Sequence, residues 1–214
     1  MGLAVFDLDG TVTRHNTFGP YLLGMLVRRP WRLMRLPAAL PAVVRFSLGR
    51  CGRGALKGAL MRATLGGIAR ADLAHWSERF AARWAAHGTF ASARAAIQAH
   101  ARAGDHLVLM SASPDLYVPA IGRALGFQEI ICTGVRWDGE RLDGRLSTAN
   151  CRGEEKVRHL RQLRERVPGA ASAYGNSITD IAHLALVEHG VLVNGTRGAR
   201  RTACRTGLTC ERWR

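Results

Sequence analysis

Two aspartates one residue apart stand at the end of a short apolar run near the start of the chain. Ala4-Val5-Phe6 leads directly into Asp7-Leu8-Asp9-Gly10-Thr11. An apolar run of this kind is typical of a buried strand, on which side chains two residues apart point the same way. Two converging carboxylates repel each other unless a cation lies between them, and Mg²⁺ prefers such oxygen ligands. The pattern predicts an active site at a strand end, although an isolated Asp-x-Asp-Gly is equally typical of a solvated turn.

Further polar side chains follow later apolar runs. In chain order they are Ser111 after a strand, Lys156 on a helix, and Asn176 with Asp180 after another strand. Open α/β sheets bind their ligands at the carboxyl ends of their strands. If these strands are parallel neighbours, the side chains meet the two aspartates at one edge of the sheet.

The elements that must position these residues alternate between strand and helix. Expected strands are 4–6, 107–110, 130–132, 171–174 and 191–193, with a short edge strand near 207–210; expected helices are 89–103, Pro114 to Gly126, 154–167 and 181–187. Two Asp-Gly turn signals predict a small hairpin within 135–146. The alternation predicts an α/β fold, with a Rossmann-like parallel sheet and helices on both faces.

A basic segment interrupts this pattern after the first strand. No acidic residue lies between Asp9 and Asp72, whereas the same interval holds eleven arginines and lysines. Leucine, valine and tryptophan residues alternate with the arginines, and Pro30, Pro37 and Pro41 divide the run into short helices. We therefore expect a helical cap domain over residues 15–85 and a core domain formed by residues 1–14 and 86–214.

The composition limits the partners and the location of the chain. Its 214 residues are 47% hydrophobic and carry a net charge of +15, which favours an anionic partner. The five cysteines form no Cys-x-x-Cys pair, and the first strand begins too early to leave room for a signal peptide. The apolar run 36–44 is too short to span a membrane. We expect a cytoplasmic protein, with peripheral contact to the inner face of the membrane as an open alternative.

Taken in order, Asp-Leu-Asp-Gly-Thr, the strand ending in Ser111, Lys156 and Gly-Asn-Ser-x-x-Asp resemble the haloacid dehalogenase (HAD) superfamily of phosphohydrolases. The helical insertion after the first strand is similar to that of its phosphoserine-phosphatase-like branch, subfamily IB. The strings Ser111-Ala112-Ser113-Pro114 and Asn150-Cys151-Arg152-Gly153-Glu154-Glu155-Lys156 resemble the same branch. The resemblance implies a Mg²⁺-dependent phosphatase that forms an aspartyl-phosphate.

The resemblance also implies a role for each matching residue. Asp7 would be the nucleophile, Asp9 the general acid and base, and Lys156 the cation that stabilises the transition state. Phosphate would be bound by Gly10, Thr11, Ser111, Ala112 and Lys156; Mg²⁺ would be bound by Asp7, Asp9 through its carbonyl, Asn176 and Asp180. Ser113 is more typical of the N-cap of the following helix, whose N-terminal amides would add to the phosphate site.

One position departs from the family pattern. Many relatives have an aspartate where this chain has Asn176, whose amide oxygen can bind a metal but carries no charge. Either Asn176 is a neutral ligand and Asp180 supplies the charge, or metal binding is weakened and the protein is a catalytically weak binding module. The retention of the other motif residues favours the first interpretation.

The cap determines the substrate in this superfamily. Its arginines favour a small anionic phosphomonoester; phosphoserine is disfavoured because no acidic residue before Asp72 could receive its ammonium group. The alternating apolar residues could instead form interfacial helices, which would suit a lipid phosphate such as phosphatidylglycerophosphate or lysophosphatidate. Alternatively, they form the core of the cap itself. No recognition motif supports a specific nucleic-acid partner, and nothing predicts the oligomeric state.

Overall fold

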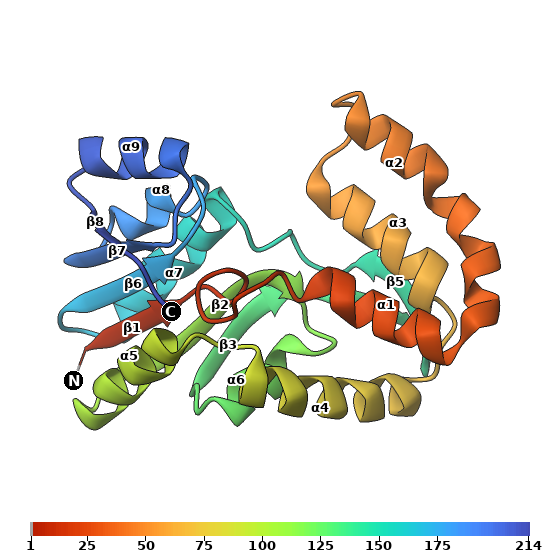
Figure 1. Cartoon of the computed structure of the whole chain (residues 1–214), viewed down its shortest axis with the longest axis horizontal. Coiled ribbons are helices and arrows are strands. Elements are labelled where there is room, and N and C mark those ends of the chain that lie inside the picture. Colours follow the sequence, from red (N-terminus) through yellow and green to blue (C-terminus); the bar gives the residue numbers. More distant parts are fainter. Residues whose placement is uncertain (1) are drawn as a thin grey trace.

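The computed structural model describes residues 2–214 and is built around a six-stranded sheet with the strand order β3-β2-β1-β6-β7-β8 (Figure 1). The strands are β1 (Leu3–Phe6), β2 (His106–Pro114), β3 (Glu129–Thr133), β6 (Ala171–Gly175), β7 (His189–Val193) and β8 (Thr209–Glu211). Each neighbouring pair runs parallel. The predicted parallel sheet is confirmed, including its short edge strand.

Helices cover both faces of the sheet because its strands are apolar on both sides. On β1, Ala4 and Phe6 face one hydrophobic cluster, whereas Leu3 and Val5 face another. The first cluster receives side chains from α5 (Ala91–Arg102) and α6 (Val118–Ala124); the second receives them from α7 (Glu154–Arg166), α8 (Ile181–Leu184) and α9 (Arg197–Arg205). The predicted α/β architecture with helices on both faces is therefore confirmed.

The strand order brings the predicted site residues to one edge. From the central β1 the chain passes to β2 on one side and later to β6 on the other. Phe6 lies beside Leu109 of β2 and Tyr174 of β6 in register. The residues that follow these three positions therefore lie near one another, toward the carboxyl ends of the strands.

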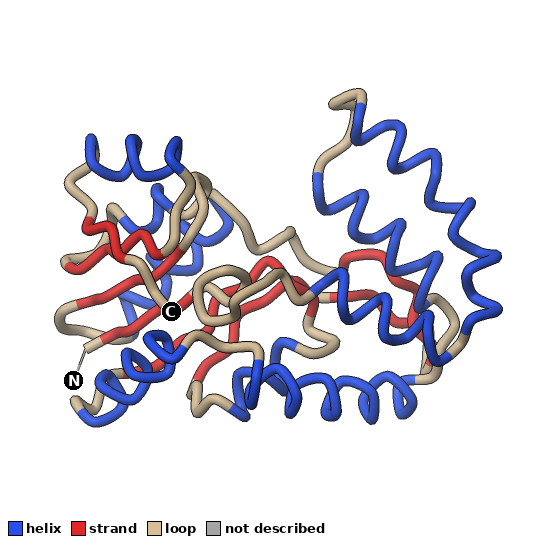
Figure 2. Tube along the Cα trace, viewed as in Figure 1, coloured by secondary structure: helices blue, strands red, loops and turns tan. Residues whose placement is uncertain are grey.

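The insertion after β1 forms a group of helices at the end of the molecule remote from β6, β7 and β8 (Figures 1 and 2). Its elements are α1 (Phe18–Arg28), the 3₁₀ helix η1 (Pro30–Ala39), α2 (Leu40–Ser47), α3 (Arg53–Leu65) and α4 (Arg70–His87). Pro30 begins η1 and Pro41 lies in the first turn of α2, so these two prolines divide the segment as expected, whereas Pro37 lies inside η1 and does not end it.

Cap and core are joined by shared packing. The rings of Tyr21 of α1, Phe80 of α4 and Tyr117 before α6 pack together, with the Phe80 ring edge-on to both tyrosines and centroids 4.4–5.2 Å apart. The hairpin of β4 (Val135–Asp138) and β5 (Arg141–Leu146) also reaches the cap, where the Leu142 amide donates to the Ile68 carbonyl at 3.0 Å. The cap therefore has no separate apolar core: its buried side chains continue the cluster on the α5–α6 face of the sheet.

The chain enters and leaves the cap at neighbouring points. Thr13 and Thr89 form an antiparallel bridge, and the Arg14 amide donates to the Gly88 carbonyl at 2.8 Å. The Phe90 amide donates to the Val12 carbonyl at 3.0 Å. These hydrogen bonds tie the two connections together beside the predicted active site.

One expected helix begins later than predicted. β2 continues through Pro114, and α6 starts only at Val118 because the segment from Ser113 is still extended. The prediction that Ser113 caps a helix is wrong, because Ser113 belongs to β2 and α6 has Tyr117 at its N-cap position.

Candidate active site

The floor of the site is a buried cluster of three charges. The Lys156 ammonium, carried on α7, donates to Asp7 Oδ1 at 2.7 Å and to Asp180 Oδ1 at 2.9 Å. The side chains of Lys156, Asp7 and Asp180 are 2%, 10% and 4% exposed. The cation that two converging carboxylates require is thus supplied by the protein itself, between Asp7 and Asp180 rather than between Asp7 and Asp9.

Burial and charge shift the pKa values of the three groups in different directions. Burial raises the pKa of Asp7 to about 7, and the nearby Lys156 only partly opposes this effect. Burial also acts to raise the pKa of Asp180, but Lys156 and the Ser177 hydroxyl outweigh it and hold the pKa below its usual range. Burial alone would lower the pKa of Lys156, yet the two carboxylates raise it above the ordinary value. Lys156 therefore stays charged.

A tight turn after β1 presents the second aspartate. Gly10 has φ +80°, and a Cβ there would lie 2.0 Å from the amide nitrogen of Asn176, so only glycine fits beneath that side chain. Thr11 is fully buried, and its hydroxyl donates to Asp7 Oδ2 at 3.3 Å. Gly10 and Thr11 thus shape the loop around Asp7, while Asn176 lies against the loop from the end of β6.

The Asp9 carboxylate is held by donors from both sides of the cleft. Its Oδ1 accepts from the backbone amide and the hydroxyl of Thr17, both at 2.7 Å. Its Oδ2 accepts from the Ser113 hydroxyl at 2.6 Å. The Thr17 hydroxyl is in turn 3.0 Å from the Tyr117 hydroxyl. Ser113 and Thr17 are positioning residues for the predicted general acid.

The two remaining predicted phosphate contacts differ in their surroundings. Ser111 is fully buried, and its hydroxyl oxygen accepts from the Ser113 amide at 3.1 Å. Ala112 lines the cleft, but its carbonyl oxygen accepts from Lys57 and, at 2.7 Å, from Thr133. Ser111 therefore lies behind the cleft wall, whereas Ala112 forms part of it.

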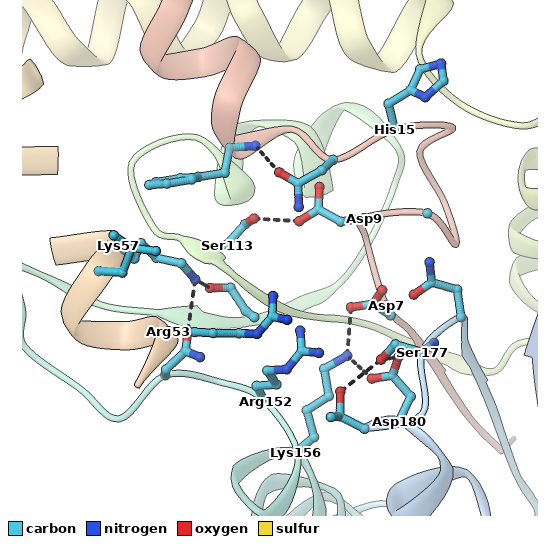
Figure 3. Close-up of a pocket in the computed structure, with 18 of the residues that line it drawn as sticks. Asp7, Asp9, His15, Arg53, Lys57, Ser113, Arg152, Lys156, Ser177 and Asp180 are labelled. Atoms are coloured by element: carbon cyan, nitrogen blue, oxygen red, sulfur yellow. Dashed lines mark hydrogen bonds and ion pairs between the residues drawn. The ribbon is translucent and has the colours of Figure 1, made fainter. Parts of the chain in front are cut away.

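Cap and core together enclose a cleft of about 650 Å³ above this floor. Figure 3 shows Arg53 and Lys57 of α3 entering from the cap side and Arg152 and Lys156 from the core side. Lys57 also donates to Asn150 Oδ1 at 2.9 Å. Burial lowers the pKa of Lys57 to about 8, despite the opposing charge of Asp9. The cleft is therefore a cationic pocket with carboxylates at its base.

The donors at its base suit a hard cation. Asp7, Asn176 and Asp180 all line the cleft with oxygen atoms, the ligand type that Mg²⁺ prefers. Lys156 occupies Asp7 Oδ1 and Asp180 Oδ1, which leaves Asp7 Oδ2 with only the long contact to Thr11. Among residues 2–214, no three His, Cys, Asp or Glu side chains cluster as a metal site. A Mg²⁺ ion here would thus need the Asn176 amide and the Asp9 carbonyl besides Asp7.

Several residues of the site had no sequence signal of their own. Lys57 was one of eleven basic residues in the insertion, and Thr17 one of several hydroxyl residues in the loop before α1. Arg152 and Asn150 lay within a string that resembled the family, which was the one available indication. His183 is 1% exposed, and its Nδ1, 4.0 Å from Asp180 Oδ1, has no hydrogen-bond partner among residues 2–214. Burial lowers its pKa to about 3, so it is neutral.

Fold and site together define a capped α/β protein with a parallel sheet and a buried carboxylate at the end of its first strand. The chain belongs to the haloacid dehalogenase-like hydrolase family, whose sequence profile matches residues 4–185. The resemblance inferred from the motifs is confirmed.

Relatives of known sequence agree with this assignment. Protein CicA of Caulobacter vibrioides is 32% identical over 188 residues, which cover 87% of this chain and 83% of CicA. A protein of Mycobacterium tuberculosis named as a probable phosphatase is 36% identical over 117 residues, which cover 53% of this chain and 40% of that protein.

Solved structures share the fold. A protein of unknown function from Bordetella pertussis superposes with a TM-score of 0.80 at 23% identity, covering 97% of this chain and 96% of that one. A substrate-bound phosphoserine phosphatase superposes with a TM-score of 0.67 at 13% identity, covering 98% and 91%. Within residues 2–214, none of the helices has both the length and the apolar character needed to cross a membrane.

Proposed function

We propose that the protein is a phosphatase that hydrolyses phosphate monoesters through a phosphorylated Asp7. The observation that carries this proposal is the Asp7 carboxylate at the base of a cationic cleft, with one oxygen fixed by Lys156 at 2.7 Å. Its other oxygen, Oδ2, is held only by Thr11 at 3.3 Å and is the atom available to attack phosphorus. The probable phosphatase among the relatives supports the same reaction class.

The residues divide the reaction into two steps. Asp7 Oδ2 forms a bond to phosphorus while the bond to the leaving oxygen breaks, and Asp9 donates a proton to that oxygen. Asp9 then accepts a proton from water, whose oxygen attacks phosphorus and releases phosphate and the free Asp7 carboxylate. Lys156 stabilises the negative charge that spreads over the phosphoryl oxygens. A bound Mg²⁺ would supply further positive charge to those oxygens.

The neutral Asn176 sets the affinity for that ion. We expect Asn176→Asp to lower the Mg²⁺ concentration for half-maximal activity by about tenfold, because it adds a charge to an oxygen ligand of similar shape. Calorimetric Mg²⁺ titration of the wild type and the variant checks this, with Asn16→Asp as the charge-matched control at the cleft rim. Activity that persists in full after chelation of divalent metals would contradict the metal assignment.

The cleft supports a small anionic phosphomonoester as substrate. Arg53, Lys57 and Arg152 supply positive charge around the floor. The acidic residues lining the cleft are Asp7, Asp9 and Asp180, all from the core. Because the cap contributes no carboxylate to this lining, an ammonium-bearing substrate such as phosphoserine lacks a partner there.

A lipid phosphomonoester is the second candidate. Phe46 of α2 and Leu56 and Leu60 of α3 line the cap side of the same cleft. An apolar wall opposite the charged floor would accept the first carbons of an acyl or glycerol-linked chain, whereas a polar metabolite would leave it unused.

The nucleophile assignment is tested by Asp7→Asn. We expect phosphate release from p-nitrophenyl phosphate to fall at least about a thousandfold, since the nucleophile is lost. Asp138→Asn, an exposed aspartate on the β4–β5 hairpin, is the control and should retain full activity. If wild-type protein with Mg²⁺ releases no phosphate from a panel of metabolite and lipid phosphates, the protein is instead a binding module on this scaffold.

A further inference from the structure

We propose that the outer end of the cap docks on the surface of an anionic lipid bilayer. The docking surface, here called the η1–α2 face, consists of Trp31, Leu33, Met34, Leu40, Val44 and Leu48 with the exposed arginines Arg35, Arg45 and Arg50. It lies at the end of the molecule remote from β6, β7 and β8, where η1 and α2 form the outer edge of the cap (Figure 1). This proposal concerns a surface and is independent of the reaction at Asp7.

The first argument is the exposure of apolar side chains on consecutive elements. Met34 is 85% exposed, Leu40 62% and Val44 52%. Six of the eight residues of α2 are Leu, Pro, Ala, Val or Phe, yet none of its residues is buried. A helix of this composition normally buries one face, so the concentration of exposed apolar side chains on these two consecutive elements indicates an interaction surface.

The expectation that these apolar residues form the core of the cap is therefore corrected. Tyr21, Leu22 and Met25 of α1 are buried in the cluster shared with the sheet. The apolar residues of η1 and α2 that alternate with the arginines are exposed instead, because α2 packs mainly on α3 and η1, and η1 on α1 and α3, which leaves the outer sides of both elements uncovered.

The second argument is charge. The segment from Gly10 to Ala71 contains no acidic residue, and Arg45 and Arg50 are exposed and have no ion-pair partner among residues 2–214. Exposed arginines among apolar side chains are the composition of helices that lie in the interface of an anionic membrane. A second copy of this chain would bring the same uncompensated arginines together, and their repulsion disfavours self-association through this face.

The third argument is continuity with the cleft. Phe46 lies on α2, between the exposed Val44 and Leu48, and its side chain lines the cleft above Asp7. A bilayer under the η1–α2 face would therefore adjoin one wall of that cleft. Docking would place the cationic pocket close to the headgroup region.

The test is co-flotation of the purified protein with vesicles. We expect the wild type to bind vesicles of equimolar phosphatidylglycerol and phosphatidylcholine at low salt, and not vesicles of phosphatidylcholine alone. Replacing exposed apolar residues by Met34→Asp and Val44→Asp should weaken binding by at least about tenfold, and so should Arg45→Glu with Arg50→Glu.

Matched controls distinguish binding through the η1–α2 face from nonspecific attraction of a basic protein to anionic vesicles. Arg201→Glu with Arg205→Glu changes the net charge equally on the exposed basic helix α9, and Leu186→Asp adds a charge at an exposed leucine near α8. Both controls should bind vesicles within about twofold of the wild type, because docking needs the apolar residues and the arginines at one place.

Three results would overturn the proposal. They are a wild type that binds no anionic vesicles, α9 controls that lose as much binding as the η1–α2 variants, and sedimentation showing a dimer that Met34→Asp and Val44→Asp dissociate. The assay contains no phosphomonoester substrate and works equally with Asp7→Asn, so its failure leaves the proposed phosphatase reaction unaffected.

Discussion

The floor of the cleft and the outer end of the cap use positive charge in opposite ways. At the floor, Lys156 is almost fully buried and bonded to two carboxylates. At the η1–α2 face, Arg45 and Arg50 are exposed and lie among exposed apolar side chains. A buried charge fixes the geometry of the ion pairs that it makes within the protein, whereas an exposed charge attracts anionic molecules or surfaces from outside. Under the two proposals, the buried cation of this basic chain serves the reaction and the exposed arginines serve binding to the bilayer.

The largest effect is expected from Lys156→Met at the floor of the cleft. This change leaves Asp7 and Asp180 buried without their cation, and we expect a loss of about 3–5 kcal/mol in the free energy of unfolding, together with loss of activity. Urea denaturation at neutral pH measures the loss. The loss should shrink as the pH falls, because protonation removes the uncompensated carboxylate charge.

Arg158→Met, on the exposed side of the same helix, is the control and should leave the urea midpoint unchanged. A Lys156→Met protein as stable as this control would show that the two carboxylates do not need the ammonium.

A smaller effect is expected from Ser113→Ala, which removes the hydroxyl that holds Asp9 Oδ2 at 2.6 Å. We expect kcat to fall by about 10- to 100-fold for alkyl phosphates, with KM unchanged, because the general acid is less well positioned. The loss should be smaller for p-nitrophenyl phosphate, whose leaving group needs no proton. Ser92→Ala, at the start of α5, is the control. Equal losses for both substrates would contradict a role through Asp9.

The smallest of the three effects concerns Lys57 on the cap side. Its pKa is lowered to about 8 by burial, so its ammonium is charged below pH 8 and neutral above it. We expect kcat/KM for an anionic phosphomonoester to fall by about tenfold as the pH rises through this value. Lys57→Arg keeps its charge over this range, so the fall in kcat/KM with rising pH should disappear in this variant. If kcat/KM of Lys57→Arg still falls over this pH range, the fall is caused by the titration of another group.

The fold followed from the sequence because its signals are local. Leu3–Phe6 and the apolar parts of β2, β6 and β7 are short runs between polar turns, and their alternation with helices implies a parallel sheet. The meeting of Asp7, Lys156 and Asp180 followed from the same topology, since Asp7 and Asp180 follow the neighbouring strands β1 and β6, and Lys156 lies in the first turn of α7, the helix that precedes β6. Their catalytic roles stay predictions.

The parts that could not be predicted depend on distant partners. Ser-x-Ser-Pro is locally indistinguishable from a helix start, and only contact with Asp9, 104 residues away, shows what Ser113 does. Lys57 reaches Asn150 across 93 residues. The outward orientation of Leu33 and Val44 had no signal either, because apolar residues alternating with arginine look the same whether protein or solvent covers them.

The paired connections beneath the cap carry a consequence for evolution and engineering. Because Thr13 and Thr89 already lie side by side, the core could lose or exchange the intervening segment without moving a strand. The exchanged segment would have to cover again the β4–β5 hairpin, the ring of Tyr117 and the face of α6 on which α4 packs. A different domain inserted at this junction would leave Asp7, Lys156 and Asp180 in place and would supply a different surface over the cleft. Substrate specificity can therefore change without a change in these three residues.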